Sequence, residues 1–513
     1  MPAPVEIGPD GVSAADVVAV ARGGAPATLT AEARAALERG AIVVARLVDR
    51  PEPVYGVSTG FGALANTVIP DDRSAELQLA LLRSHAAGMG PEVELEVVRA
   101  MMLLRARSLA MGFSGARPVV AETILALLNA GVTPVVREHG SLGASGDLAP
   151  LASAALVLVG EGEARRADGT LVDGATALAD AGVAPVALRA KEGLALINGT
   201  DGMLGILVLA LADLDGLLRV ADVAGALSTE ALLGTDRAFA AELVAMRPQL
   251  GQQVSAANMT QLLAGSAVVA SHRVGDDRVQ DAYSLRCSPQ VHGAARDTIE
   301  HARAIAAREL ASFIDNPIVL PDGRVESCGN FHGAPVAAVA DFLAISIADI
   351  GALSERRTDR LLDAKRSQGL PPFLAPDAGV NSGLMIAQYA QAAMVAENRR
   401  LAVPASADTL PTSAMQEDHV SLGWSAARKL RQAVANLARI LSVELLAGAW
   451  GDVLRQPLTP GAGTGAAVDV VLSAAGHPGP DQWLAPRLAA VEDVVTSGTL
   501  LAAVDGALDT PLA

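Results

Sequence analysis

The feature that most constrains the fold is an apolar repeat at helical spacing near the C-terminal end of the chain. Leu and Val recur three or four residues apart, which places them on one face of a single long α-helix. Comparable stretches run over residues 93–110, 203–233, 334–353 and 385–401. Long helices must bury their apolar faces against one another, so the sequence predicts a mainly α-helical bundle. The repeat consists of Leu430, Val434, Leu437, Leu441 and Leu445.

The composition agrees with closely packed helices in a soluble protein. Hydrophobic residues make up 51% of the 513 residues and aromatic residues only 3%, and small side chains allow helices to approach closely. The net charge of −17 and isoelectric point of about 4.9 argue against nucleic acid as a partner. Acidic residues interrupt the apolar runs, and the N-terminus lacks a secretory pattern. With two cysteines, we expect a cytoplasmic protein without a membrane partner.

Strand signals are sparse and mark connections between helices. Turn residues at 167–170 and 321–324 lie between short runs and predict two hairpins. Glycine- and proline-rich segments at 371–372 and 460–465 predict loops. We expect two domains. Residues 1–200 form a smaller, mainly helical domain that carries a glycine-rich loop, and residues 201–513 form the long-helix bundle with C-terminal helices that mediate oligomerisation.

The glycine-rich loop at residues 140–152, GSLGASGDLAPLA, carries the strongest chemical signal. At its centre Ala144-Ser145-Gly146 can cyclise, because Gly146 has no Cβ to resist a tight backbone geometry. Attack of the Gly146 nitrogen on the Ala144 carbonyl, with loss of water from Ser145, gives a methylidene-imidazolone ring. Such a ring is an electrophile, which no ordinary side chain is. Residues 148–158 predict a helix whose N-terminus favours negative charge at the ring.

Two plainer interpretations of this loop stay open on its residues alone. Its glycines could cradle a phosphate, and Ser145 or Asp147 could cap a helix. The phosphate interpretation lacks a clear preceding strand, a Gly-Lys-Ser/Thr ending and a downstream ribose-binding acid.

Further polar clusters occur among small or apolar residues along the chain. Gln280, Tyr283 and Arg286 would share a face if their stretch were helical. Each cluster taken singly also fits a core histidine, a helix surface or a charge at a helix N-terminus. Asp418-His419 has no companion at metal-binding spacing, so we expect no catalytic metal. The residues at the cluster centres are Tyr55, His85, Asn198, Gln280, Tyr283, Arg286, Phe331 and Glu417.

Together these segments resemble the aromatic amino-acid ammonia-lyase family, from about Tyr55 to beyond Leu430. The extended Ala-Ser-Gly loop is the most specific element of the likeness. The resemblance implies a long-helix bundle of the ammonia-lyase/fumarase-aspartase-like type, assembled as a homotetramer whose active sites combine loops from several subunits. It also implies a 4-methylideneimidazol-5-one prosthetic group, formed autocatalytically from Ala144, Ser145 and Gly146 without an external cofactor.

The same resemblance assigns roles to individual residues. Tyr55 matches the base that removes the substrate β-proton, and Arg286 matches the residue that binds the substrate carboxylate. Phe331 matches an aromatic residue near the prosthetic group. The residues matching those that support the prosthetic group and the substrate amine are Asn198, Gln280 and Tyr283.

His85 and Glu417 match residues that contact the imidazole of histidine. Glu417 discriminates better, because relatives with benzene-ring substrates usually have glutamine there and a carboxylate accepts a hydrogen bond from imidazole. The implied reaction is therefore the non-oxidative deamination of L-histidine to trans-urocanate and ammonia, the first step of histidine degradation. The alternatives are a tyrosine or phenylalanine ammonia-lyase, an aminomutase with the same prosthetic group, or a catalytically silent helical scaffold.

Overall fold

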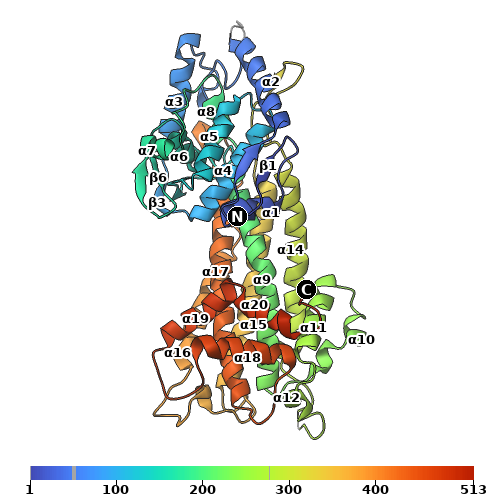
Figure 1. The fold of residues 1–513 in the computed structure, drawn as a ribbon. Coiled ribbons are helices and arrows are strands. Elements are labelled where there is room, and N and C mark those ends of the chain that lie inside the picture. The colour runs from blue at the N-terminus through green and yellow to red at the C-terminus, as the bar shows by residue number, and fades with distance from the viewer. Residues whose placement is uncertain (1, 49–52, 277) are drawn as a thin grey trace. The chain divides into compact units, whose positions relative to one another are not determined.

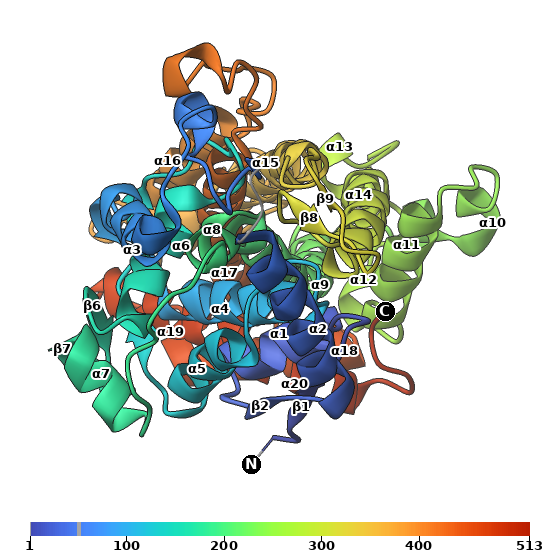
Figure 2. The same ribbon diagram turned by 90° about the horizontal axis from the view of Figure 1, so that it is seen from above.

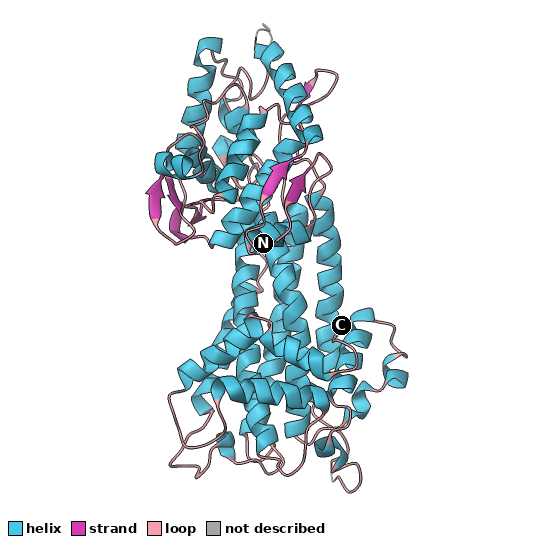
Figure 3. Ribbon diagram, in the orientation of Figure 1, coloured by secondary structure: helices cyan, strands magenta, loops and turns pink. Residues whose placement is uncertain are grey.

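The computed structural model describes residues 2–48, 53–276 and 278–513 and is mainly helical, as the apolar repeats predict (Figure 3). Every member of the repeat between Leu430 and Leu445 is buried. The predicted long stretches are helices in the structure, with bounds that differ by several residues at some ends. They are α4 (Leu95–Ala110), α9 (Asp201–Ala231), α15 (Ala334–Leu362), α16 (Met385–Leu401) and α17 (Gly423–Val453).

Both predicted hairpins are confirmed. Strand β6 (Glu163–Arg165) pairs antiparallel with β7 (Leu171–Asp173), and β8 (Ile318–Val319) pairs antiparallel with β9 (Val325–Glu326). Short 3₁₀ turns also occur in the connections, at Gly62–Leu64, Asp71–Arg73, Asp236–Phe239, Pro372–Leu374 and Ser413–Met415.

The prediction of a loop over residues 460–465 is wrong, because helix α18 (Ala462–Ala475) begins inside this segment. Gly461 occupies the N-cap position, and its backbone N–H donates to the buried carboxylate of Glu230 at 2.8 Å. A Cβ at Gly461 would lie 2.4 Å from the Leu262 carbonyl oxygen. The glycine here permits close packing at a helix start and does not mark a flexible connector.

The chain divides into two compact units that each draw on three segments. The first unit comprises Met1–Leu209, Arg303–Asp341 and Pro404–Arg428, and the second comprises Ala210–Ala302, Phe342–Val403 and Lys429–Ala513. The first unit contains Tyr55, His85, Ala144, Ser145, Gly146, Asn198, Phe331 and Glu417, whereas the second contains Gln280, Tyr283 and Arg286.

In the first unit, the buried helix α4 packs against three helices (Figure 2). These are α1 (Ala14–Ala21), α2 (Ala31–Val48) and α5 (Pro118–Asn129). Helix α6 (Leu148–Leu158) packs against α3 (Ser74–His85), α7 (Gly174–Asp180) and α8 (Glu192–Ile197). The short strands are β1 (Val5–Ile7) parallel to β2 (Ala27–Leu29), β3 (Met89–Glu92) antiparallel to β5 (Arg137–His139), and β4 (Thr133–Pro134) antiparallel to β6.

In the second unit, segments of long helices lie alongside one another (Figure 1). Ser228 on α9 donates to Glu444 on α17 at 2.7 Å, and buried Arg357 on α15 pairs with the same carboxylate at 2.8 Å. His292 on α14 (Ser288–Leu310) contacts Asp222 on α9 at 2.8 Å. The unit also contains α10 (Ala241–Val244), α11 (Leu250–Leu262), α12 (Ala267–Ala270), α13 (Tyr283–Arg286), α19 (Leu484–Thr496) and α20 (Thr499–Ala507).

Two helices in the described part of the chain, α15 and α17, are long and apolar enough to cross a membrane by length and composition. Their most apolar windows are nevertheless 56% and 89% buried inside the protein. Both are therefore core helices of a soluble protein.

Candidate active site

The glycine-rich loop folds back on itself just before α6. Gly143 and Gly146 form an isolated antiparallel bridge around Ala144 and Ser145. The φ angles are +71° at Gly143, +64° at Ser145 and +81° at Gly146, and a serine in the left-handed region is uncommon. A Cβ at Gly146 would lie 2.1 Å from the Gly199 carbonyl oxygen, so glycine alone fits this position. The turn around Ala144 and Ser145 is therefore tight, and its conformation depends on left-handed backbone at Gly143, Ser145 and Gly146.

Neither Ser145 nor Asp147 acts as a helix cap. Helix α6 starts at Leu148 as predicted, but the Asp147 side chain at the N-cap position makes no capping bond. Its carboxyl group instead accepts hydrogen bonds from Ser141 Oγ and from the backbone N–H of Met203, both at 2.8 Å. Ser145 Oγ donates to Asn198 Oδ1 at 2.8 Å. The loop is therefore fastened to residues 198–203.

The segment that receives Ser145 is itself held by a buried guanidinium. Asn198 directly follows α8, and Arg105 Nη1 donates to the carbonyl oxygens of Ala195 at 3.1 Å and Asn198 at 2.7 Å. A cation that satisfies the free carbonyls at a helix C-terminus stabilises that end of the helix. The Asn198 amide is thus presented to Ser145 from a fixed backbone.

Burial raises the pKa of Asp147 to about 7, and the negative charge of Asp201 adds to this rise. Hydrogen bonds from Met203 and Ser141 act in the opposite direction. Because the folded-state pKa lies above the ordinary value of 3.8, the folded state binds the proton more tightly than the unfolded state does.

We expect the free energy of unfolding of the wild type to fall relative to that of Asp147→Asn as the pH rises from 3.8 to about 7. Above that range the difference between the two proteins should stay constant. Melting temperatures of the two proteins across this pH range test the prediction. A difference in melting temperature that is constant with pH would contradict it.

The Tyr55 loop rests on a small apolar cluster formed by Val44, Leu47, Val57 and Val319. The backbone N–H of Gly62 donates to Tyr55 Oη at 3.5 Å. Burial raises the pKa of the Tyr55 phenol, while the Gly62 N–H acts to lower it.

Glu417 lies near both Tyr55 and His85. Its negative charge adds to the pKa rise of the Tyr55 phenol and opposes the lowering of the His85 pKa, which burial causes. Thr412 Oγ1 donates to Glu417 Oε2 at 3.0 Å, and the Ala63 N–H donates to Ser413 Oγ at 3.1 Å. These bonds join the Tyr55 loop to the segment that carries Glu417. The structure thus brings a phenol, an imidazole and a carboxylate into one region.

Phe331 belongs to a loop that packs beside the glycine-rich loop. A Cβ at Gly333 would lie 2.3 Å from Met203 Sδ and 3.1 Å from Ser421 Oγ. A Cβ at Gly143 would lie 2.0 Å from the same Ser421 oxygen, so both glycine backbones border Ser421. The backbone two residues after Phe331 is therefore adjacent to the loop of Ala144, Ser145 and Gly146.

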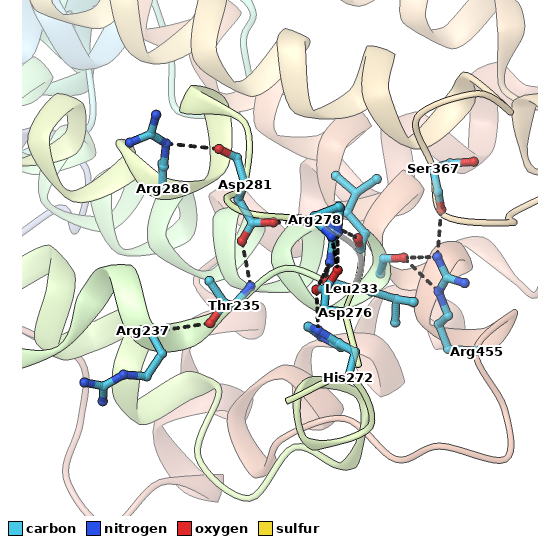
Figure 4. A network of polar contacts seen from close by, with 12 residues as sticks. Leu233, Thr235, Arg237, His272, Asp276, Arg278, Asp281, Arg286, Ser367 and Arg455 are labelled. Carbon is cyan, nitrogen blue, oxygen red and sulfur yellow. Dashed lines mark hydrogen bonds and ion pairs between the residues drawn. The ribbon is translucent and has the colours of Figure 1, made fainter. Parts of the chain in front are cut away.

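The remaining candidates lie in the second unit, on and before α13. This helix has only four residues and Gln280 precedes it, so the helical condition for a shared face holds for Tyr283 and Arg286 but not for Gln280. The Asp281 carboxylate accepts a hydrogen bond from the Thr235 N–H at 2.7 Å (Figure 4). Ala282 is extended, so the helix begins only at Tyr283. The guanidinium of Arg286 lies 4.5 Å from the centre of the Tyr283 ring, and that tyrosine is 71% exposed.

Sequence reasoning missed the buried charges beneath Asn198. Lys191 and Asp315 form an ion pair with both side chains fully buried, and Asp201 pairs with Arg105 at 3.3 Å. These residues lie far apart in sequence and in no recognisable motif. Only the unusual polarity of a lysine between apolar segments could have indicated them.

Known proteins are similar to this chain over nearly its whole length. Residues 12–473 match the family model described as aromatic amino acid lyase. The chain is 61% identical over 502 residues to a histidine ammonia-lyase of Streptomyces avermitilis, covering 98% of each chain. Its fold matches a tyrosine aminomutase from Streptomyces globisporus with a TM-score of 0.93 and 36% identity, covering 99% and 100% of the two chains. A histidine ammonia-lyase from Trypanosoma cruzi matches with a TM-score of 0.90 and 37% identity, covering 98% and 96%.

Proposed function

Because this chain belongs to the aromatic amino acid lyase family, we propose that it catalyses the non-oxidative deamination of L-histidine to trans-urocanate and ammonia. The observation that carries the proposal is the 61% identity, over 98% of both chains, to a histidine ammonia-lyase. The reaction is a carbon–nitrogen lyase step and would begin histidine degradation. A cytoplasmic location, without membrane or nucleic-acid partners, is part of the same proposal.

The family uses a methylidene-imidazolone group, and the residues of this chain fit its formation. The Gly146 nitrogen would bond to the Ala144 carbonyl carbon. The carbonyl oxygen would leave as water with the amide hydrogens of Gly146 and Ser145, which forms a C=N bond from that carbon to the Ser145 nitrogen. Ser145 would lose its Cα proton and its hydroxyl group as a second water, which leaves a Cα–Cβ double bond. Left-handed φ angles at Ser145 and Gly146, and the lack of room for a Cβ at Gly146, support this assignment. The finished ring supplies an electrophile that makes the substrate amino group a better leaving group.

Tyr55 is the proposed base for the substrate β-proton. It must be ionised to act, and its raised pKa means that only a small fraction is ionised at neutral pH. The Gly62 N–H bonds the phenol oxygen and favours the ionised form. A phenolate of high basicity suits a weakly acidic carbon-bound proton.

His85 and Glu417 are the proposed contacts for the substrate imidazole. Burial lowers the His85 pKa, which favours the neutral ring and allows it to donate or accept a hydrogen bond. Thr412 holds Glu417 Oε2, which fixes the carboxylate as an acceptor. An imidazole N–H can donate to this acceptor, whereas a benzene ring cannot.

Arg286 is the proposed partner of the substrate carboxylate, since a guanidinium binds carboxylates through two parallel hydrogen bonds. Asn198, Gln280 and Tyr283 are the proposed supports of the prosthetic group and the substrate amine, and Phe331 is the proposed aromatic neighbour of the ring. The high exposure of Tyr283 supports a site that a second copy of the chain completes. Exposed Phe342, Ile345 and Ile386 on α15 and α16 support the proposed homotetramer.

Replacing Glu417 by glutamine should raise KM for histidine by about tenfold to a hundredfold, because the imidazole N–H would then donate to a neutral amide oxygen instead of a carboxylate. Steady-state kinetics measure the change, and size-exclusion chromatography checks assembly. The matched variant Glu326→Gln, at an exposed position on β9, should behave as the wild type. An unchanged KM in Glu417→Gln would remove this residue from substrate recognition.

The test of the proposed reaction is a substrate panel on purified protein. Histidine should yield trans-urocanate and ammonia, and tyrosine and phenylalanine should yield neither ammonia nor a rearranged β-amino acid. Preferred conversion of tyrosine would favour an ammonia-lyase or aminomutase for that substrate, the activity named for the S. globisporus structure. Absence of activity on the whole panel would favour the silent scaffold.

A further inference from the structure

The side-chain amide of Asn198 is held in one orientation by groups on its far side. Its Nδ2 donates to Asp315 Oδ1 at 3.0 Å and to the Asn316 carbonyl oxygen at 2.8 Å. Two acceptors on that side exclude the flipped amide, whose oxygen would face both of them. The amide oxygen therefore faces Ser145, whose hydroxyl donates to it at 2.8 Å.

Asp315 is held in turn by Lys191. Lys191 Nζ lies 2.8 Å from Asp315 Oδ2, and neither side chain is exposed to solvent. Asp315 Oδ1 also accepts from the N–H of Asn316 at 2.7 Å. With one oxygen on the lysine and the other on Asn198 and the backbone, the carboxylate has no free rotation. A chain of contacts thus runs from Lys191 through Asp315 and Asn198 to Ser145.

The backbone of Lys191 is an independent sign that this arrangement is maintained. Its φ and ψ angles are +67° and −17°, in the left-handed region that non-glycine residues seldom adopt. Such strain persists only where the surrounding structure fixes it. The strained residue lies at the N-terminus of α8, the helix that Asn198 follows.

We propose that the buried Lys191–Asp315 pair positions the Asn198 amide for maturation of the Ala144-Ser145-Gly146 loop. This inference rests on the proposed function, because it concerns the loss of water from Ser145. With its hydroxyl proton directed at Asn198 Oδ1, the Ser145 oxygen keeps its lone pairs free. As the Cβ–O bond breaks, one of these lone pairs takes up a proton and the oxygen departs as water. Ser145 gives up its Cα proton in exchange, and a Cα–Cβ double bond forms. Lys191 and Asp315 are positioning residues, since they act through Asn198.

The substitution Asp315→Asn should reverse the orientation of the Asn198 amide. Lys191 would hold the new amide oxygen, which turns the new NH₂ group toward Asn198 Nδ2 and favours the flipped Asn198 amide. Removing the cation as well, in Lys191→Met/Asp315→Asn, lets the residue-315 amide turn its oxygen back toward Asn198. The double variant should therefore mature faster than Asp315→Asn, which a purely structural role of the ion pair does not predict.

The experiment follows maturation by intact mass after expression is induced, with samples taken from the soluble fraction and quenched in acid. Asp315→Asn and Lys191→Met should each lose the two waters about tenfold more slowly than the wild type, the effect of one misplaced hydrogen bond. Asp222→Asn is the matched control. It disturbs another fully buried carboxylate, paired with His292 in the second unit, and should lower the melting temperature without slowing maturation.

The outcomes separate this inference from the proposed function. Maturation at the wild-type rate in both single variants, or no gain in the double variant, would overturn the positioning role. Retention of both waters by the wild-type chain would instead overturn the proposed function. Slow single variants with a faster double variant would establish the pair as a positioning device.

Discussion

Replacing Ser145 by alanine should abolish deamination and leave the chain at its full unprocessed mass. Alanine has no hydroxyl group to lose, so the double bond that makes the ring electrophilic cannot form. We expect kcat to fall by at least about three orders of magnitude, or ~4 kcal/mol in the barrier. Because Ser145 has a left-handed φ, alanine adds little strain beyond that already present.

Ser153→Ala is the matched control for this variant. Ser153 lies on α6, and its hydroxyl donates to the Ala149 carbonyl of the same helix at 3.0 Å. This variant should mature and turn over histidine like the wild type. Substantial turnover by Ser145→Ala, measured as urocanate formation, would show that the reaction needs no electrophile from this loop.

Replacing Tyr55 by phenylalanine should reduce kcat by about 10²–10⁴, the usual contribution of a general base. The aromatic ring is kept, with its edge-to-face packing on Phe61 at a distance of 6.5 Å between ring centres. The melting temperature should therefore change little. Only the phenol oxygen and its bond from the Gly62 N–H are lost.

The pH dependence gives this prediction a second measurement. The base acts when ionised, and burial raises the Tyr55 pKa, so kcat/KM should rise with pH through neutrality into the alkaline range. Tyr55→Phe should lose that rise, whereas Tyr389→Phe, at an exposed position, should retain it. Near-normal turnover in Tyr55→Phe would remove Tyr55 as the essential base.

The helices could be predicted because their burial pattern is periodic in the sequence. Leu430 and Leu445 are on the same buried face, as their spacing requires. Gly461 shows where composition misleads. It reads as a loop residue, yet it lies at a helix start where the Leu262 carbonyl leaves no room for a side chain.

The contacts around the candidate site could be predicted only in part. The start of α6 follows from its apolar run, but Asp147 bonds the first turn of α9 and not its own helix. Gln280 lies outside α13 because the carboxylate of Asp281 is held by a distant backbone N–H. Such tertiary contacts override local spacing.

The charges that orient Asn198 could not be predicted at all. Lys191 and Asp315 are 124 residues apart, and no local pattern relates them. Their pairing depends on how α8 packs beneath the loop that follows α14. A buried ion pair of this kind becomes visible only once the fold is known.

The central claim is that Ala144, Ser145 and Gly146 form the electrophile that deaminates histidine. It is tested most directly by the mass of the wild-type peptide containing these residues, taken from protein with measured urocanate production. We predict that this peptide lacks the mass of two water molecules in active protein. A peptide of full unmodified mass, from protein that converts histidine at a normal rate, would contradict the account.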